Sequence, residues 1–172
     1  PAFAFSLCLL QGSIAMGQDR KPATGAGEWR SLFDGESLQG WQQTPFSGSG
    51  EVRVENGTIA LGAGKPMTGV TWTGSFPRSD YEIRFEGVRF RGNDFFATVT
   101  FPVRDSFCTL VTGGWGGDIV GLWGIDGWDA SDNETRTYFN FETGRWYGFR
   151  VQITADRIRV WIDEKPVVNV GI

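Results

Sequence analysis

Residues 113–129 combine the residue types that a binding or catalytic site for a polar ligand requires. These seventeen positions hold three tryptophans, three aspartates and seven glycines. Tryptophan offers a flat apolar face with one N–H donor, aspartate offers acceptors or a titratable acid, and glycine lets a backbone approach a ligand closely. The mixture predicts a site for a polyhydroxylated ligand. The alternative is a pair of strands with glycines at the bends and tryptophans in the core.

The candidate site residues come from this stretch and from the turns beside it. The candidates for acid–base catalysis are the carboxylates of Asp118, Asp126 and Asp94. The candidates for substrate binding are Trp115, Trp123, Trp128, Arg104 and Asp129. Arg89 and Arg91 are further possible donors to a ligand oxygen. Each has a structural alternative: a carboxylate can cap its own turn, a tryptophan can pack in the core, and an arginine at a strand margin can guard an edge.

An acidic run, composed of Asp126, Asp129, Asp132, Asn133 and Glu134, is the nearest approach to a metal site. Its spacing does not match a calcium-binding EF-hand loop, so a solvated acidic loop is the preferred interpretation. The sequence predicts no metal ligands and no cofactor, although a divalent metal such as calcium stays an open alternative.

Composition excludes several classes of function. The chain of 172 residues has no histidine, which removes the usual neutral-pH general base and any Ser-His-Asp triad. Its net charge is -4, so it has no basic field that would attract nucleic acid or anionic lipid. Proton transfer would have to use carboxylates, Tyr, Lys or water.

The N-terminal residues predict export. Residues 1–17 are apolar, carry no charged side chain and end with Ala15 and Gly17 as the small residues of a cleavage site, so they resemble a signal peptide whose basic start is missing. The segment is too short to cross a bilayer. Residues 18–28 resemble a linker, and the folded domain is expected from residue 29 to residue 172. We therefore expect a periplasmic or extracellular location.

Hydrophobic alternation predicts an all-β fold. About ten short strands are expected, separated by turn signals at intervals of roughly ten residues, as in a β-sandwich or jelly roll of two antiparallel sheets. Residues 51–61 predict a hairpin that turns at Asn56-Gly57, and residues 95–101, apolar on both faces, predict a central strand. Because the sequence ends directly after a predicted strand, we expect the last strands of the domain to be missing.

Five segments resemble a known bacterial family, the 3-keto-disaccharide hydrolase domain. They are LFDGESLQGW at 32–41, EVRVENGTIAL at 51–61, DYEI at 80–83, GRWY at 144–147 and VWID at 160–163. Together they extend over most of the chain. The resemblance implies a concanavalin A-like jelly-roll fold and an exported protein.

The resemblance also implies action on glycosides whose sugar is oxidised at C3, by elimination followed by hydration. We carry no catalytic position over from the family. The expected partner is an oligosaccharide or glycoside substrate, and the oligomeric state is not predicted. Two other classes of function stay open: a carbohydrate-binding, lectin-like module without chemistry, and an interaction domain of a larger secreted protein.

Overall fold

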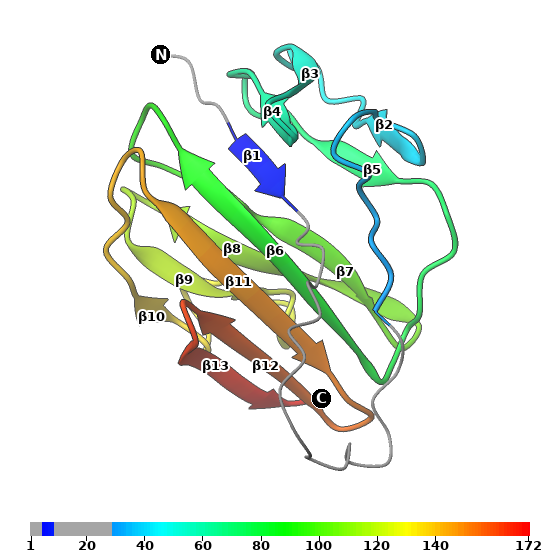
Figure 1. The fold of residues 1–172 in the computed structure, drawn as a ribbon. Coiled ribbons are helices and arrows are strands. Elements are labelled where there is room, and N and C mark those ends of the chain that lie inside the picture. Colours follow the sequence, from blue (N-terminus) through cyan, green and yellow to red (C-terminus); the bar gives the residue numbers. More distant parts are fainter. Residues whose placement is uncertain (1–4, 9–28) are drawn as a thin grey trace, which may run out of the picture.

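A computed structural model of the protein describes residues 5–8 and 29–172, and its strands form three antiparallel sheets. Figure 1 shows the largest, a seven-stranded sheet. In spatial order its strands are β13 (Lys165–Gly171), β12 (Arg157–Ile162), β11 (Trp146–Ile153), β6 (Tyr81–Arg89), β1 (Phe5–Cys8), β4 (Thr58–Leu61) and β3 (Val52–Glu55).

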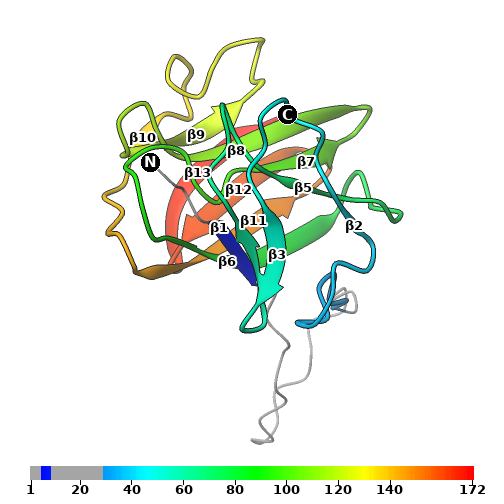
Figure 2. The ribbon, with the colours of Figure 1, turned by 90° about the horizontal axis from the view of Figure 1, so that it is seen from above.

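The second layer of the molecule is a four-stranded sheet, accompanied by a separate pair of strands. The sheet contains β10 (Thr137–Tyr138), β9 (Ile119–Trp123), β8 (Ser106–Gly114) and β7 (Val99–Val103), in that order, and the pair is β2 (Trp41–Gln43) with β5 (Val70–Trp72). Figure 2, seen from above, shows the four-stranded sheet stacked against the seven-stranded one. This arrangement confirms the predicted all-β sandwich of antiparallel sheets, and it is consistent with a jelly roll.

Side-chain alternation explains why the two sheets stack. Along β11, Tyr147, Phe149, Val151 and Ile153 are buried, while the residues between them face outward. The ring of Phe149 stacks on that of Phe85 of β6, with a centroid distance of 4.9 Å. The facing core residues of the other sheet include Phe101, Leu110 and Leu122. A smaller, separate cluster of Phe33, Ile59 and Leu61 lies beneath β3, β4 and the β2–β5 pair.

Local predictions had mixed outcomes. The hairpin at Asn56-Gly57 is confirmed, and both residues have the positive φ angles, 52° and 74°, that a tight type I′ turn requires. The central strand predicted at residues 95–101 is wrong: the strand begins at Val99, and β7 lies at the edge of its sheet. Ala97, with a φ of 51°, interrupts the extended backbone before the strand begins.

Strand β1 joins two parts of the seven-stranded sheet. It pairs with β4 on one side and with β6 on the other, and β4 and β6 are not neighbours in the sheet. Its residues belong to the predicted signal peptide, whose other residues lie outside the described residues, as does the predicted linker at residues 18–28. Cleavage after Gly17 would remove β1 from the mature protein. The signal peptide stays a prediction, and under that prediction the mature protein lacks this strand. No helix in the described residues is long and apolar enough to cross a membrane.

Removal of residues 1–17 should uncouple the two parts of the sheet. We expect the shortened chain to unfold in two transitions, because the unpaired edges of β4 and β6 leave the small core of Phe33 without its hydrogen-bonded link to the large core. Urea unfolding, followed by tryptophan fluorescence and far-UV circular dichroism, measures this. Leu7→Pro should act in the same direction because it removes an N–H from the strand, whereas Leu7→Val serves as the control. A single transition with an unchanged midpoint in the shortened chain would contradict this role of β1.

Candidate functional site

The outward side of the four-stranded sheet carries a surface of exposed aromatic rings, which we call the aromatic face. It comprises Trp123 and Phe107 on the strands, Phe95 and Trp115 at one end, and Trp128 at the other. The three tryptophans that the sequence singles out are 42% (Trp115), 53% (Trp123) and 62% (Trp128) exposed. They are therefore not core residues.

Strand register places Trp123 and Phe107 on the same side of the sheet. Trp123 lies opposite Thr109, and Thr109 lies opposite Thr100, whose hydroxyl is 2.8 Å from the Thr109 hydroxyl. Phe107 is two positions before Thr109 on β8, so it has the same orientation. The guanidinium of Arg78 lies 5.6 Å from the centre of the Phe107 ring. The strands thus present rings and hydroxyl groups to the outside.

At one end of the aromatic face, the turn between β8 and β9 packs against the loop before β7. The rings of Phe95 and Trp115 are 5.1 Å apart. A side chain at Gly114 would be 2.9 Å from the Phe95 ring, and one at Gly117 would be 2.3 Å from the carbonyl oxygen of Asn93. These glycines are therefore needed for contact between two loops of the protein, and this close approach does not itself indicate a ligand.

The other end of the aromatic face is a tight turn that carries Trp128. Asp126 and Gly127 both have positive φ angles, 51° and 79°, and the Trp128 N–H donates to the Ile125 carbonyl at 2.9 Å. This is the geometry of an Asp-Gly type I′ turn, which exposes the Asp126 side chain at its tip.

The three candidate carboxylates are divided between these two ends. Asp118 precedes β9 and Asp126 follows it, so a five-residue strand lies between them, which spans about 16 Å. Two carboxylates that act on one glycosidic bond lie within about 10 Å of each other. Asp94 directly follows Asn93, whose carbonyl oxygen Gly117 approaches, and Gly117 directly precedes Asp118. Asp94 and Asp118 are therefore at the same end, and Asp126 is not.

Arg89 lies in the core beneath the Phe95 end of the aromatic face and links the loops that form this end. Its side chain is only 4% exposed, and its terminal nitrogens donate to the carbonyl oxygens of Asp94 (3.2 Å) and Phe141 (3.1 Å). Its backbone carbonyl accepts a hydrogen bond from Gly144. Among the described residues it has no carboxylate within ion-pair distance, and burial lowers the pKa of its guanidinium. Its two terminal nitrogens are therefore engaged by the protein backbone, while its Nε is buried and has no hydrogen-bond partner among the described residues.

Arg104 and the acidic run have structural contacts in the fold. The guanidinium of Arg104 donates to the carbonyl oxygens of Ala155 (2.6 Å) and Ile172 (3.0 Å). The Asn133 amide donates to the carbonyls of Leu122 and Asp129, which fixes the loop after β9 onto that strand. Within residues 29–172 no group of three or more Asp, Glu or Cys side chains is arranged to hold a metal ion.

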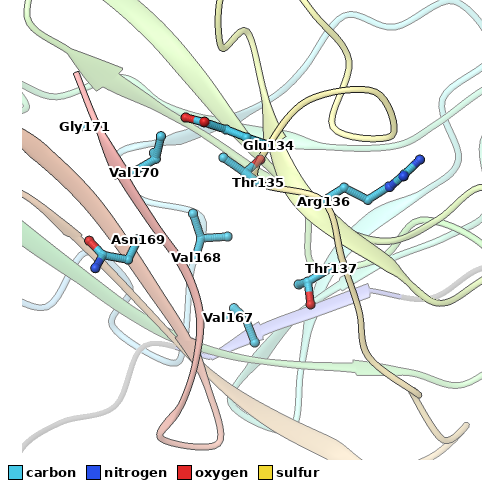
Figure 3. Close-up of a pocket in the computed structure, with 9 residues that line it drawn as sticks. All are labelled: Glu134, Thr135, Arg136, Thr137, Val167, Val168, Asn169, Val170 and Gly171. Atoms are coloured by element: carbon cyan, nitrogen blue, oxygen red, sulfur yellow. The ribbon is translucent and has the colours of Figure 1, made fainter.

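A cavity of about 430 Å³ lies between the edges of the two sheets. Figure 3 shows that it is bounded by residues 134–137 on one side and by β13 on the other, with the side chains of Arg136 and Asn169 directed away from each other. Glu134 is the only carboxylate in its lining, which contains no aromatic ring. This cavity has fewer groups suited to a sugar than the aromatic face has.

Sequence reasoning missed two rings and misjudged one arginine. Phe95 lies in the stretch predicted as a central strand but is exposed, and Phe107, which is not among the predicted site residues, occupies the outward phase of β8. Arg89 shares the inward phase of β6 with Tyr81 and Phe85, and this alternation was the signal that it enters the core.

Replacing Arg89 should destabilise the protein. Arg89→Met leaves the Asp94 and Phe141 carbonyls without their donor, so the free energy of unfolding should fall by about 2–4 kcal/mol. Urea denaturation measures the change, and Arg91→Met, at an exposed neighbouring position, should stay within about 0.5 kcal/mol of the original protein. An equal, small effect of both substitutions would show that the two hydrogen bonds contribute little.

Comparison with known proteins agrees with the motifs found in the sequence. Residues 28–171 match the family described as the 3-keto-alpha-glucoside-1,2-lyase-like domain. No curated protein and no solved structure matches the chain. Because the family match extends over most of the chain, the protein belongs to the 3-keto-alpha-glucoside-1,2-lyase-like domain family.

Proposed function

We propose that the protein is an exported domain that binds a glycoside along the aromatic face and cleaves 3-keto-glycosides at the Phe95–Trp115 end. One observation carries this proposal: Trp115, Trp123 and Trp128 are all exposed at the two ends of β9, in a domain of a carbohydrate-active family. The C–H faces of a sugar ring pack well on an indole, and its hydroxyl groups can bind the threonines between the rings.

The reaction that the family description suggests needs a base and an acid. A ketone at C3 acidifies the hydrogen on C2, so a base can remove that proton. The C1–C2 double bond forms as the bond from C1 to the glycosidic oxygen breaks, and the leaving oxygen takes up a proton. Water then adds across the double bond, which makes the net reaction a hydrolysis. Each proton transfer needs a group within hydrogen-bond reach of the substrate.

We assign these proton transfers to Asp94 and Asp118. The chain has no histidine, and these two carboxylates belong to loops that contact each other beside Trp115. Both residues are half-buried, which limits competition from bulk water. Asp126, at the other end of β9, fits a contact with a distant part of the substrate, as do Asp129 and Trp128.

A binding module without chemistry is the second candidate function. The strands β7, β8 and β9 contain no acidic residue, and the outward position of Gly121 is covered by Ala130 and Thr135, so the strands themselves offer only rings and hydroxyl groups at the exposed part of the aromatic face. Such a surface suits recognition of a sugar more directly than cleavage, which requires carboxylates from the ends of the strands.

The cleavage proposal predicts turnover of a 3-keto-disaccharide, measured as the release of 3-keto-glucose. Asp118→Asn and Asp94→Asn should each lower kcat/KM at least tenfold, because an amide cannot exchange the proton. Asp156→Asn, in the exposed turn between β11 and β12, is the matched control and should retain the rate. If only Asp126→Asn lowered the rate, the reaction would have to be assigned to the opposite end of β9. Absence of turnover in the original protein would exclude the cleavage proposal.

The binding component predicts a separate effect of the tryptophans. Trp123→Ala should weaken binding of the glycoside at least fivefold in calorimetric titration, because the central ring of the aromatic face is lost. Phe46→Ala, which removes an exposed ring outside this face, should leave the affinity unchanged. Retained binding without turnover would favour the binding module, and unchanged binding in Trp123→Ala would contradict the assigned surface.

A further inference from the structure

The opposite side of the sandwich carries a second cluster of polar and aromatic side chains. It lies on the outward side of β6, β11 and β12, the neighbouring strands at the front in Figure 1. Strand register aligns the cluster in two rows across these strands. We call it the arginine face, and it comprises Glu82, Arg84, Arg150, Gln152, Arg159 and Trp161.

Arg150, at the centre of this face, has unused hydrogen-bonding capacity. Its Nε is buried and has no partner, and its contact with Glu82 is long, at 3.9 Å. Its single short contact is to Glu164 at 3.1 Å, and the Glu164 side chain is 80% exposed. The Trp161 ring lies against the guanidinium, whose carbon is 3.7 Å from the ring centre. The group is thus held in place by stacking, and because Nε is buried, its terminal nitrogens are the donors that a ligand can reach.

The three arginines of the arginine face are matched in number by carboxylates on or beside it, those of Glu82, Glu86 and Glu164. Arg84 and Arg150 are directly opposite each other on neighbouring strands, which places two like charges side by side. Glu82 is the carboxylate between them and bonds Arg84 Nε at 2.7 Å. Arg159 donates to a neutral acceptor, the Gln152 amide oxygen, at 3.0 Å. Two arginines that lie opposite each other, one of them with a single short carboxylate contact, favour an anionic ligand at this position.

The chemistry of the arginine face indicates which anion fits. Guanidinium groups form two parallel hydrogen bonds with a carboxylate, and a lysine would not supply this fork geometry. Trp29, which is 59% exposed, lies 4.5 Å from the Arg84 guanidinium and adds a flat apolar surface next to the charged groups. An acidic group joined to a ring with an apolar face would use both features.

We propose that the arginine face is a second ligand site, distinct from the aromatic face, that binds the carboxylate of an acidic sugar such as a uronic acid. Arg150 and Arg84 bind the carboxylate, and the rings of Trp161 and Trp29 flank the sugar. The choice of a sugar as the carrier of the carboxylate rests on the proposed function, whereas the choice of an anion rests on the two arginines that lie opposite each other on this face.

Calorimetric titration with a galacturonate tetrasaccharide tests the proposal, with maltotetraose as the neutral sugar and sodium acetate as the free carboxylate. The acidic tetrasaccharide should bind at least tenfold more tightly than either, and its affinity should fall with added salt. Arg150→Met should lower the affinity at least tenfold. Arg53→Met, at an exposed arginine that pairs with Glu51 and Glu55 on β3, should leave it unchanged.

Further variants distinguish a loss of binding at the arginine face from a folding defect and from binding at the aromatic face. Arg150→Lys keeps the charge but loses the fork, so it should fold normally and bind more weakly than the original protein. Trp123→Ala should leave binding of the acidic tetrasaccharide unchanged, whatever its effect on neutral or 3-keto sugars. Equal affinity for the neutral tetrasaccharide or acetate, unchanged affinity in both Arg150 variants, or no binding of the acidic tetrasaccharide would overturn the proposal.

Discussion

The register between β6 and β11 is the constraint on which both faces of the sandwich depend. Phe85 and Phe149 are partners in this register, and their stacked rings fill the centre of the core. Because side chains alternate along a strand, fixing these two residues inward also fixes Arg84 and Arg150 outward. A slip of one residue would bury the arginines and expose the phenylalanines, so the packing of the core and the composition of the outer surface are determined together.

At one end of the sandwich this alternation places a charged side chain in the core, because Arg89 occupies an inward position of β6. Placing a guanidinium inside the protein costs free energy unless its donors are satisfied, and here the carbonyls of Asp94 and Phe141 accept from the two terminal nitrogens, while Nε has no partner. The same bonds fix the loops that carry Phe95 and lead to β11. A single buried guanidinium therefore adds to the backbone pairing at the end of β6, and the aromatic face gains a fixed end.

Alternation made most strands predictable, because one buried and one wet face leave a period of two in the sequence. The periods of residues 80–90, 145–154 and 157–163 correspond to β6, β11 and β12. The same rule failed for residues 95–101, where Phe95 turns outward onto Trp115 and the apolar run does not distinguish a ring that packs on a surface from one in the core.

Tertiary contacts could not be predicted in the same way. The glycines of residues 113–129 indicated a close approach to a ligand, but Gly114 and Gly117 meet Phe95 and Asn93. The separation of Asp118 from Asp126 becomes apparent only when β9 is known to lie between them. The two faces themselves are on opposite sides of a core about 10 Å thick, and groups that far apart with no shared partner contribute additively. A ligand on one face should therefore leave affinity at the other unchanged, unless it shifts the register that both faces share.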